Sequence, residues 1–196
     1  MLLFILGLGL FFGIHMLPFF PEYRALIIEK IDSDTLEGEP VYKVTFAVIA
    51  LLGLVVAGFG KGSMEFIGLW NTPTFFRYAS VVLILVSFIL MVAAYLPNNI
   101  KRYVSHPMLT GVIIWAAAHL LVNGDVAAII LFGSFVVYSV VAIILINQRP
   151  DDKNNVQDTQ ESIPIEKDAI VLGVAVAGFL LLLWLHEALF ARAIFL

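Results

Sequence analysis

Six long apolar runs, separated by short polar segments, dominate the pattern of this 196-residue chain. The runs cover residues 2–20, 44–59, 77–96, 108–122, 126–146 and 169–190. A membrane-spanning helix needs about 20 mostly apolar residues, so the second run is marginal and the fourth is short. The pattern predicts an all-α fold, a polytopic membrane helix bundle with about six transmembrane helices.

A single tight turn separates the fourth and fifth runs. Its residues, Asn123, Gly124 and Asp125, are of the types that favour turns. The two runs therefore form a predicted helical hairpin over residues 108–146, and Asp125 is placed to cap the second helix. The length of the first arm leaves open whether it crosses the membrane fully.

Composition supports a membrane protein and narrows its chemistry. The chain is 61% hydrophobic and only 13% charged, whereas soluble domains carry about 25% charged residues. Cysteine is absent, which excludes disulfides, cysteine-ligated zinc and iron–sulfur clusters. A metal or cofactor would need histidine, carboxylate or backbone ligands. No basic patch suggests a nucleic-acid partner, and the lipid bilayer is the first partner expected.

The basic residues predict a topology. In a six-span arrangement one side of the membrane carries most of them: Arg24, Lys30, Lys43, Lys101, Arg102, Arg149, Lys153 and Lys167. The opposite side carries Lys61, Arg77 and Arg192. The richer side is expected in the cytoplasm, which leaves both termini outside. Residues 149–168 then form an acidic cytoplasmic linker before the last helix of a single membrane domain, 1–196.

Pairs of small residues four apart predict close helix contacts, because they allow backbones to approach in lipid. The pairs are Gly9 with Gly13, Gly53 with Ala57, and Gly173 with Ala177. They indicate a bundle and do not by themselves mark a site.

Two of the histidines inside apolar runs, His15 and His119, are the main candidate site residues. An ionisable side chain in the membrane is costly, so it suggests a function. Each ends a glycine–aromatic–histidine series with four-residue spacing, which places the three on one helix face. The two series are Gly7, Phe11, His15 and Gly111, Trp115, His119. The glycine leaves space, and the aromatic ring and the imidazole border it, which suits a flat apolar cofactor. The alternative interpretation is that each histidine is neutral and forms a hydrogen bond to a neighbouring helix.

The other two histidines lie near helix ends. His106 precedes Pro107, which disfavours helix at this position, and belongs at the cytoplasmic interface. His186 lies beside Glu187 near the outer end of the last run, where a surface or structural pair is expected. An α-helix rises about 1.5 Å per residue, so the position of each histidine along its helix gives its depth in the membrane. By this measure His15 lies at a depth similar to that of His106, and His119 at a depth similar to that of His186.

Several short motifs resemble the NnrU family of bacterial membrane proteins, from the first helix to about Asn147. They are His106-Pro107-Met108-Leu109-Thr110-Gly111, Trp115 with His119-Leu120-Leu121, Asn123-Gly124-Asp125 and Leu131-Phe132-Gly133-Ser134, supported by His15-Met16-Leu17-Pro18, Gly38…Tyr42, Leu69-Trp70 and Ala93-Ala94-Tyr95. The resemblance implies a multi-pass protein of the bacterial inner membrane. It also implies a link to nitrite and nitric oxide metabolism in denitrification, without an agreed reaction or a settled enzyme activity.

The resemblance further implies a cofactor. A plant relative that shares the domain, 15-cis-zeta-carotene isomerase, uses haem b to isomerise a polyene. Its ligand positions match His15 and His119 here, so these are the expected metal ligands, with Phe11, Gly111 and Trp115 lining the haem pocket. The relative's alternate cysteine ligand corresponds to Ala116, which rules out a cysteine-based ligand switch in this chain. A hydrophobic small molecule would be the substrate of such an isomerase-like reaction.

A more distant likeness joins the chain to membrane methyltransferases. These place an Arg-His-Pro motif and a helical hairpin beside S-adenosylmethionine, which would make His106 a cofactor-binding residue. Here Ser105 stands in place of the arginine, and the late paired glutamates are missing. A third hypothesis is a non-catalytic assembly partner of a respiratory membrane reductase.

Overall fold

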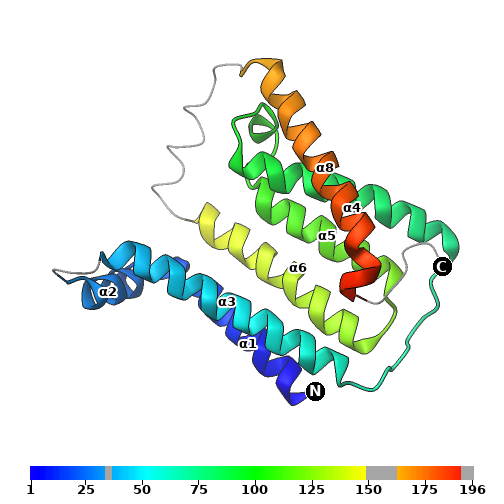
Figure 1. The fold of residues 1–196 in the computed structure, drawn as a ribbon, viewed down its shortest axis with the longest axis horizontal. Helices are drawn as coiled ribbons and strands as arrows, with labels where there is room; N and C mark the ends of the chain where they lie inside the picture. Colours follow the sequence, from blue (N-terminus) through cyan, green and yellow to red (C-terminus); the bar gives the residue numbers. More distant parts are fainter. Residues whose placement is uncertain (34–36, 149–162, 191–196) are drawn as a thin grey trace. The chain divides into compact units, whose positions relative to one another are not determined.

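The computed structural model describes residues 1–33, 37–148 and 163–190. Within these ranges it contains seven α-helices, two short 3-10 helices and no strand beyond an isolated bridge between Gly68 and Asp125. The α-helices are α1 (Leu2–Met16), α2 (Pro21–Ile31), α3 (Gly38–Gly62), α4 (Thr74–Tyr95), α5 (Pro107–Val122), α6 (Val126–Asn147) and α8 (Ile165–Phe190). The 3-10 helices are η1 (Leu17–Phe19) and η2 (Ile100–Arg102). The predicted all-α class is confirmed (Figure 1).

Five segments are long and apolar enough to cross a membrane: Leu2–Phe19, Gly38–Gly62, Thr74–Tyr95, Val126–Asn147 and Ile165–His186. The protein is therefore a multi-pass membrane protein. The sixth apolar helix, α5, has 16 residues and falls short of a full span. The marginal second run is part of α3, which extends it at both ends to 25 residues.

The chain divides into two compact units, Met1–Phe66 and Ile67–Leu196. In the first unit, α1 packs along α3 and glycines set the distance between them. A Cβ at Gly7 would overlap the backbone of Ala57, and one at Gly60 would overlap that of Phe4. Phe4 is fully buried there.

The predicted small-residue pairs are only partly correct. Gly53 and Ala57 do form the α3 side of this contact. On α1, however, Gly7 faces α3, whereas a Cβ added at Gly9 or Gly13 would meet no neighbouring atom of the described residues within 4 Å. Gly173 on α8 is equally open. Four-residue spacing repeats on every face of an apolar helix, so it does not show which face meets a neighbour.

In the second unit, α5 packs against both α4 and α6, and α8 packs against α4 (Figure 1). The fully buried Val171 and Ala175 lie on α8, and Gly178 on the same helix approaches the ring of Phe88. Ser87 of α4 donates a hydrogen bond to the carbonyl oxygen of Gly111 at 2.8 Å. A buried cluster of Ala116, Ala128 and Phe132 joins α5 to α6.

The predicted hairpin is present, with α5 and α6 as its arms. The carboxylate Oδ1 of Asp125 accepts a hydrogen bond from the Ala128 N–H at 2.9 Å, which confirms the predicted cap. The preceding loop also holds the turn, because the N–H of Leu69 donates to the Gly124 carbonyl at 2.7 Å. A side chain at Gly124 would overlap Trp70, so this close approach requires glycine.

A polar cluster ties the start of α8 to the end of α4. The Asn99 side chain donates to the carbonyl of Ile163 and to Oδ2 of Asp168, both at 2.7 Å. Residues 149–162 of the predicted acidic linker lie outside the described residues. Because α8 begins at Ile165, the last four residues of that linker are helical, with Glu166 and Asp168 in the first turn, where the helix dipole favours negative charge.

Candidate functional site

His119 lies near the end of α5, and both the helix backbone and α6 orient its ring. Its Nδ1 is 2.8 Å from the carbonyl oxygen of Trp115. Because a carbonyl oxygen only accepts, Nδ1 carries the hydrogen, and the lone pair of the neutral imidazole lies on Nε2. Phe132 of α6 stacks on the ring, with centroids 4.6 Å apart and planes inclined by 25°. His119 thus presents one nitrogen donor in a defined orientation.

Trp115 extends this aromatic cluster. Its ring centroid is 4.9 Å from that of His119, and 5.2 Å from those of Phe132 and Phe135 in edge-on contacts. Four-residue spacing correctly placed Trp115 beside His119. Sequence reasoning missed the two phenylalanines, although the predicted hairpin already brings the start of α6 next to the end of α5.

His15 repeats the arrangement in the first unit. Its Nδ1 is 2.7 Å from the carbonyl oxygen of Phe11, and the Phe11 ring lies 4.1 Å from the imidazole between centroids. Phe46 of α3 meets the imidazole edge-on at 4.9 Å. As in His119, the hydrogen is on Nδ1 and the lone pair of the neutral ring is on Nε2.

The two glycines of these series serve helix packing. Gly111 is buried, and a Cβ there would lie 3.0 Å from Cγ of Met91 and 3.1 Å from the Ser87 carbonyl oxygen, both on α4. Gly7 is similarly enclosed by α3. Close helix approach accounts for both glycines. The role of Gly111 in lining a cofactor pocket remains a prediction.

The four histidines fall in different places. His15 belongs to the first unit, whereas His106, His119 and His186 belong to the second. Within the second unit, His119 lies on α5 and His186 on α8. Joint ligation by His15 and His119 remains a prediction based on the family resemblance.

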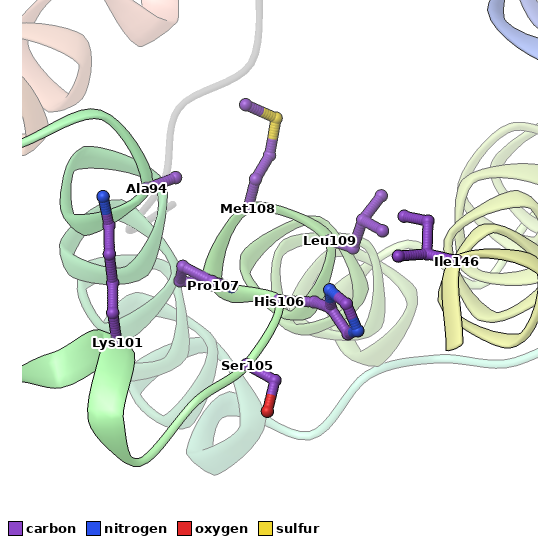
Figure 2. Close-up of a pocket in the computed structure, with 8 residues that line it drawn as sticks. All are labelled: Ala94, Lys101, Ser105, His106, Pro107, Met108, Leu109 and Ile146. Atoms are coloured by element: carbon purple, nitrogen blue, oxygen red, sulfur yellow. The ribbon is translucent and has the colours of Figure 1, made fainter. Parts of the chain in front are cut away.

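A cavity of about 460 Å³ opens beside the start of α5 (Figure 2). Its lining residues are Ala94, Lys101, Ser105, His106, Pro107, Met108, Leu109 and Ile146. His106 has φ −125° and ψ 67°, outside the helix as expected before proline. Its Nε2–H donates to Oδ1 of Asn147 at 2.8 Å, which joins the two free ends of the hairpin.

The sequence predicted that His106 lies at the membrane interface, but it did not predict which other residues line the cavity with it. Lys101 comes from η2 and Ile146 from the last turn of α6, far apart in sequence. Only the hairpin and the turn after α4 bring them together. The polar stretch before Pro107, which contains Lys101, Arg102 and Ser105, was the available signal.

Fold and site together define a polytopic helical membrane protein with imidazoles held among aromatic rings. The sequence matches the family described as NnrU protein over residues 3–193. The chain therefore belongs to the NnrU family, which confirms the resemblance seen in its motifs. Comparison with curated proteins and with solved structures finds no match.

Proposed function

We propose that this NnrU-family protein binds haem b within the membrane, with His119 as a nitrogen ligand of the iron and His15 as the second ligand that the family resemblance predicts. The supporting observation is that both imidazoles direct Nδ1–H to the backbone carbonyl four residues earlier. Metal-binding histidines commonly donate their second N–H to a backbone carbonyl, which fixes the tautomer and the ring orientation. This donor geometry fits haem iron, which takes imidazole nitrogen as an axial ligand.

The surrounding residues suit a flat apolar group. Phe11 and Phe46 flank His15, and Trp115 and Phe132 flank His119. These rings cover part of each imidazole, which is otherwise half-buried, and limit its rotation. Bound haem would supply electron transfer or reversible coordination, as needed for nitrogen-oxide metabolism or for isomerisation of a lipid-like polyene. A hydrophobic substrate of that kind would reach the protein from the bilayer.

The methyltransferase alternative receives less support. S-adenosylmethionine carries a sulfonium cation and ribose hydroxyl groups, for which carboxylates are the natural partners, and a carboxylate of its own, for which a lysine is one. The cavity beside His106 is lined by Lys101 and by no carboxylate among the described residues. Methyl transfer therefore stays the second hypothesis, after haem binding.

The test is the absorption spectrum of detergent-purified protein from haem-replete cells, oxidised and dithionite-reduced. Wild type should show a Soret band and sharp reduced α and β bands, which His15→Ala and His119→Ala should lose. His106→Ala is the matched control and should keep the wild-type spectrum. Added imidazole should restore the bands in a folded ligand variant, which distinguishes a lost ligand from a lost fold.

Three results would contradict the proposal in different ways. A featureless wild-type spectrum would exclude the haem and favour the assembly-partner hypothesis. Loss of the bands in His119→Ala and His186→Ala, but not in His15→Ala, would replace His15 by His186 as the second ligand. Retention in both His15→Ala and His119→Ala would exclude both as ligands.

A further inference from the structure

The cavity at the start of α5 has a polar and an apolar part. Lys101, Ser105 and His106 supply an ammonium, a hydroxyl and an imidazole, whereas Met108, Leu109 and Ile146 supply apolar side chains. Figure 2 shows the Lys101 and His106 side chains on either side of Pro107, with the Ser105 hydroxyl directed away from the Lys101 ammonium. Such a lining matches an amphiphile better than a uniformly polar or apolar ligand.

Among the described residues that line the cavity, Lys101 is the one that carries a full charge. Lys101 is exposed, and it forms no ion pair with any residue in the described ranges. Arg102, the next residue, is also exposed. An anionic group is therefore the expected partner of Lys101, and a phosphate can accept charge-assisted hydrogen bonds from its ammonium.

The spans place this cavity at the level of lipid headgroups. Ala94 and Ile146 belong to the last turns of the membrane-spanning helices α4 and α6, whereas Lys101 and Ser105 lie in the polar segment that follows α4. The wall of the cavity thus passes from hydrocarbon-facing to water-facing residues. A cationic pocket between helices at this level is suited to the headgroup of an anionic lipid.

From these observations we infer that the cavity binds the phosphate headgroup of an anionic phospholipid. Lys101 contacts the phosphate, and Met108, Leu109 and Ile146 contact the first methylene groups of an acyl chain. A volume of about 460 Å³ accommodates the glycerol phosphate portion and leaves the chains in the bilayer. This site is independent of the proposed haem.

Native mass spectrometry can test the inference with protein released from nanodiscs of equal phosphatidylglycerol and phosphatidylcholine. Wild type should retain phosphatidylglycerol in preference. Lys101→Gln should lower its occupancy about five-fold, the effect of one lysine near a lipid surface. Lys61→Gln removes the same charge from the last turn of α3 and should leave retention unchanged.

Equal retention of the two lipids by wild type would overturn the inference, as would equal losses in Lys101→Gln and Lys61→Gln. A second arm distinguishes a lipid from a soluble phosphate source. In nanodiscs of phosphatidylcholine alone, inorganic phosphate should leave the His106 imidazole NMR signals unmoved, whereas phosphatidylglycerol should shift them. A shift with inorganic phosphate would assign the cavity to a soluble phosphate compound. Unchanged tryptophan emission would show that the variants are folded.

Discussion

Helices α1 and α5 carry the same glycine–aromatic–histidine series but are held by different contacts. On α1, Gly7 lies directly against the backbone of α3. On α5, Gly111 meets Met91 and the Ser87 carbonyl, and Ser87 also donates to the Gly111 carbonyl. Equal spacing therefore produces equal local geometry at the histidines, while the neighbouring helix decides how each glycine is used.

The histidine ends of the two series differ in a similar way. The Nδ1 bond to the preceding turn is shared because it depends only on helix geometry. The ring partner is not shared, since Phe46 meets His15 edge-on and Phe132 stacks on His119. The tautomer of each histidine is thus set by its own helix, whereas the packing of its ring is set by the neighbouring helix.

The backbone contact on α1 should be the most sensitive to mutation. Gly7→Val places a branched side chain where even a Cβ would overlap Ala57, and we expect a loss of about 3 kcal/mol in the free energy of unfolding. Gly9→Val is the matched control, because that position is open. Denaturant titration in detergent micelles measures both. Equal losses would show that Gly7 does not face α3.

A smaller effect should follow from uncapping the hairpin next to His119. Asp125→Ala removes the acceptor of the Ala128 N–H in a buried position, which should cost about 1.5 kcal/mol. Asp125→Asn keeps a capping oxygen and should recover most of this loss. Hydrogen exchange at the first turn of α6 gives a local readout. Unchanged exchange in Asp125→Ala would exclude the cap.

Gly111→Ala should lower the free energy of unfolding less than a branched residue substituted for Gly7. The nearest obstacle is Cγ of Met91, a flexible side chain that can shift, although the Ser87 carbonyl at 3.1 Å is less adaptable. We expect a loss of about 1 kcal/mol in unfolding free energy. If haem binds, its spectrum should stay intact, because the methyl group points toward α4. A lost Soret band in a stable Gly111→Ala protein would instead place the cofactor against Gly111.

Loss of the hydrogen bond between α4 and α5 should have the smallest effect on the free energy of unfolding. Ser87→Ala removes the donor to the Gly111 carbonyl, and such bonds within membrane proteins contribute about 0.6 kcal/mol. A double-mutant cycle of Ser87→Ala and Gly111→Ala would measure the energy that couples the two positions, and so show how the α4–α5 contact differs from the α1–α3 contact. A coupling energy of zero would mean that the two changes do not act on one α4–α5 contact.

Much of the fold could be predicted where a signal is local in sequence. The turn at 123–125, the cap at Asp125 and the non-helical His106 before Pro107 were all predicted and are all confirmed. Each depends on residues within a few positions of one another. The contact faces were harder, as Gly9 and Gly13 show, because apolar helices in lipid lack the polar face that would mark their outside.

From the amino-acid sequence alone it follows that the chain is an all-helical membrane protein of the NnrU family, that α5 and α6 form a hairpin, and that two imidazoles follow aromatic residues by one helical turn. Composition and short-range spacing suffice for these features. The packing of the helices was needed to establish that Gly7 rather than Gly9 meets α3, that Phe132 stacks on His119, and that Lys101 and Ile146 share a cavity with His106. These contacts depend on how apolar helices rotate and pack against each other, and nearly uniform hydrophobicity leaves that choice to side-chain shape.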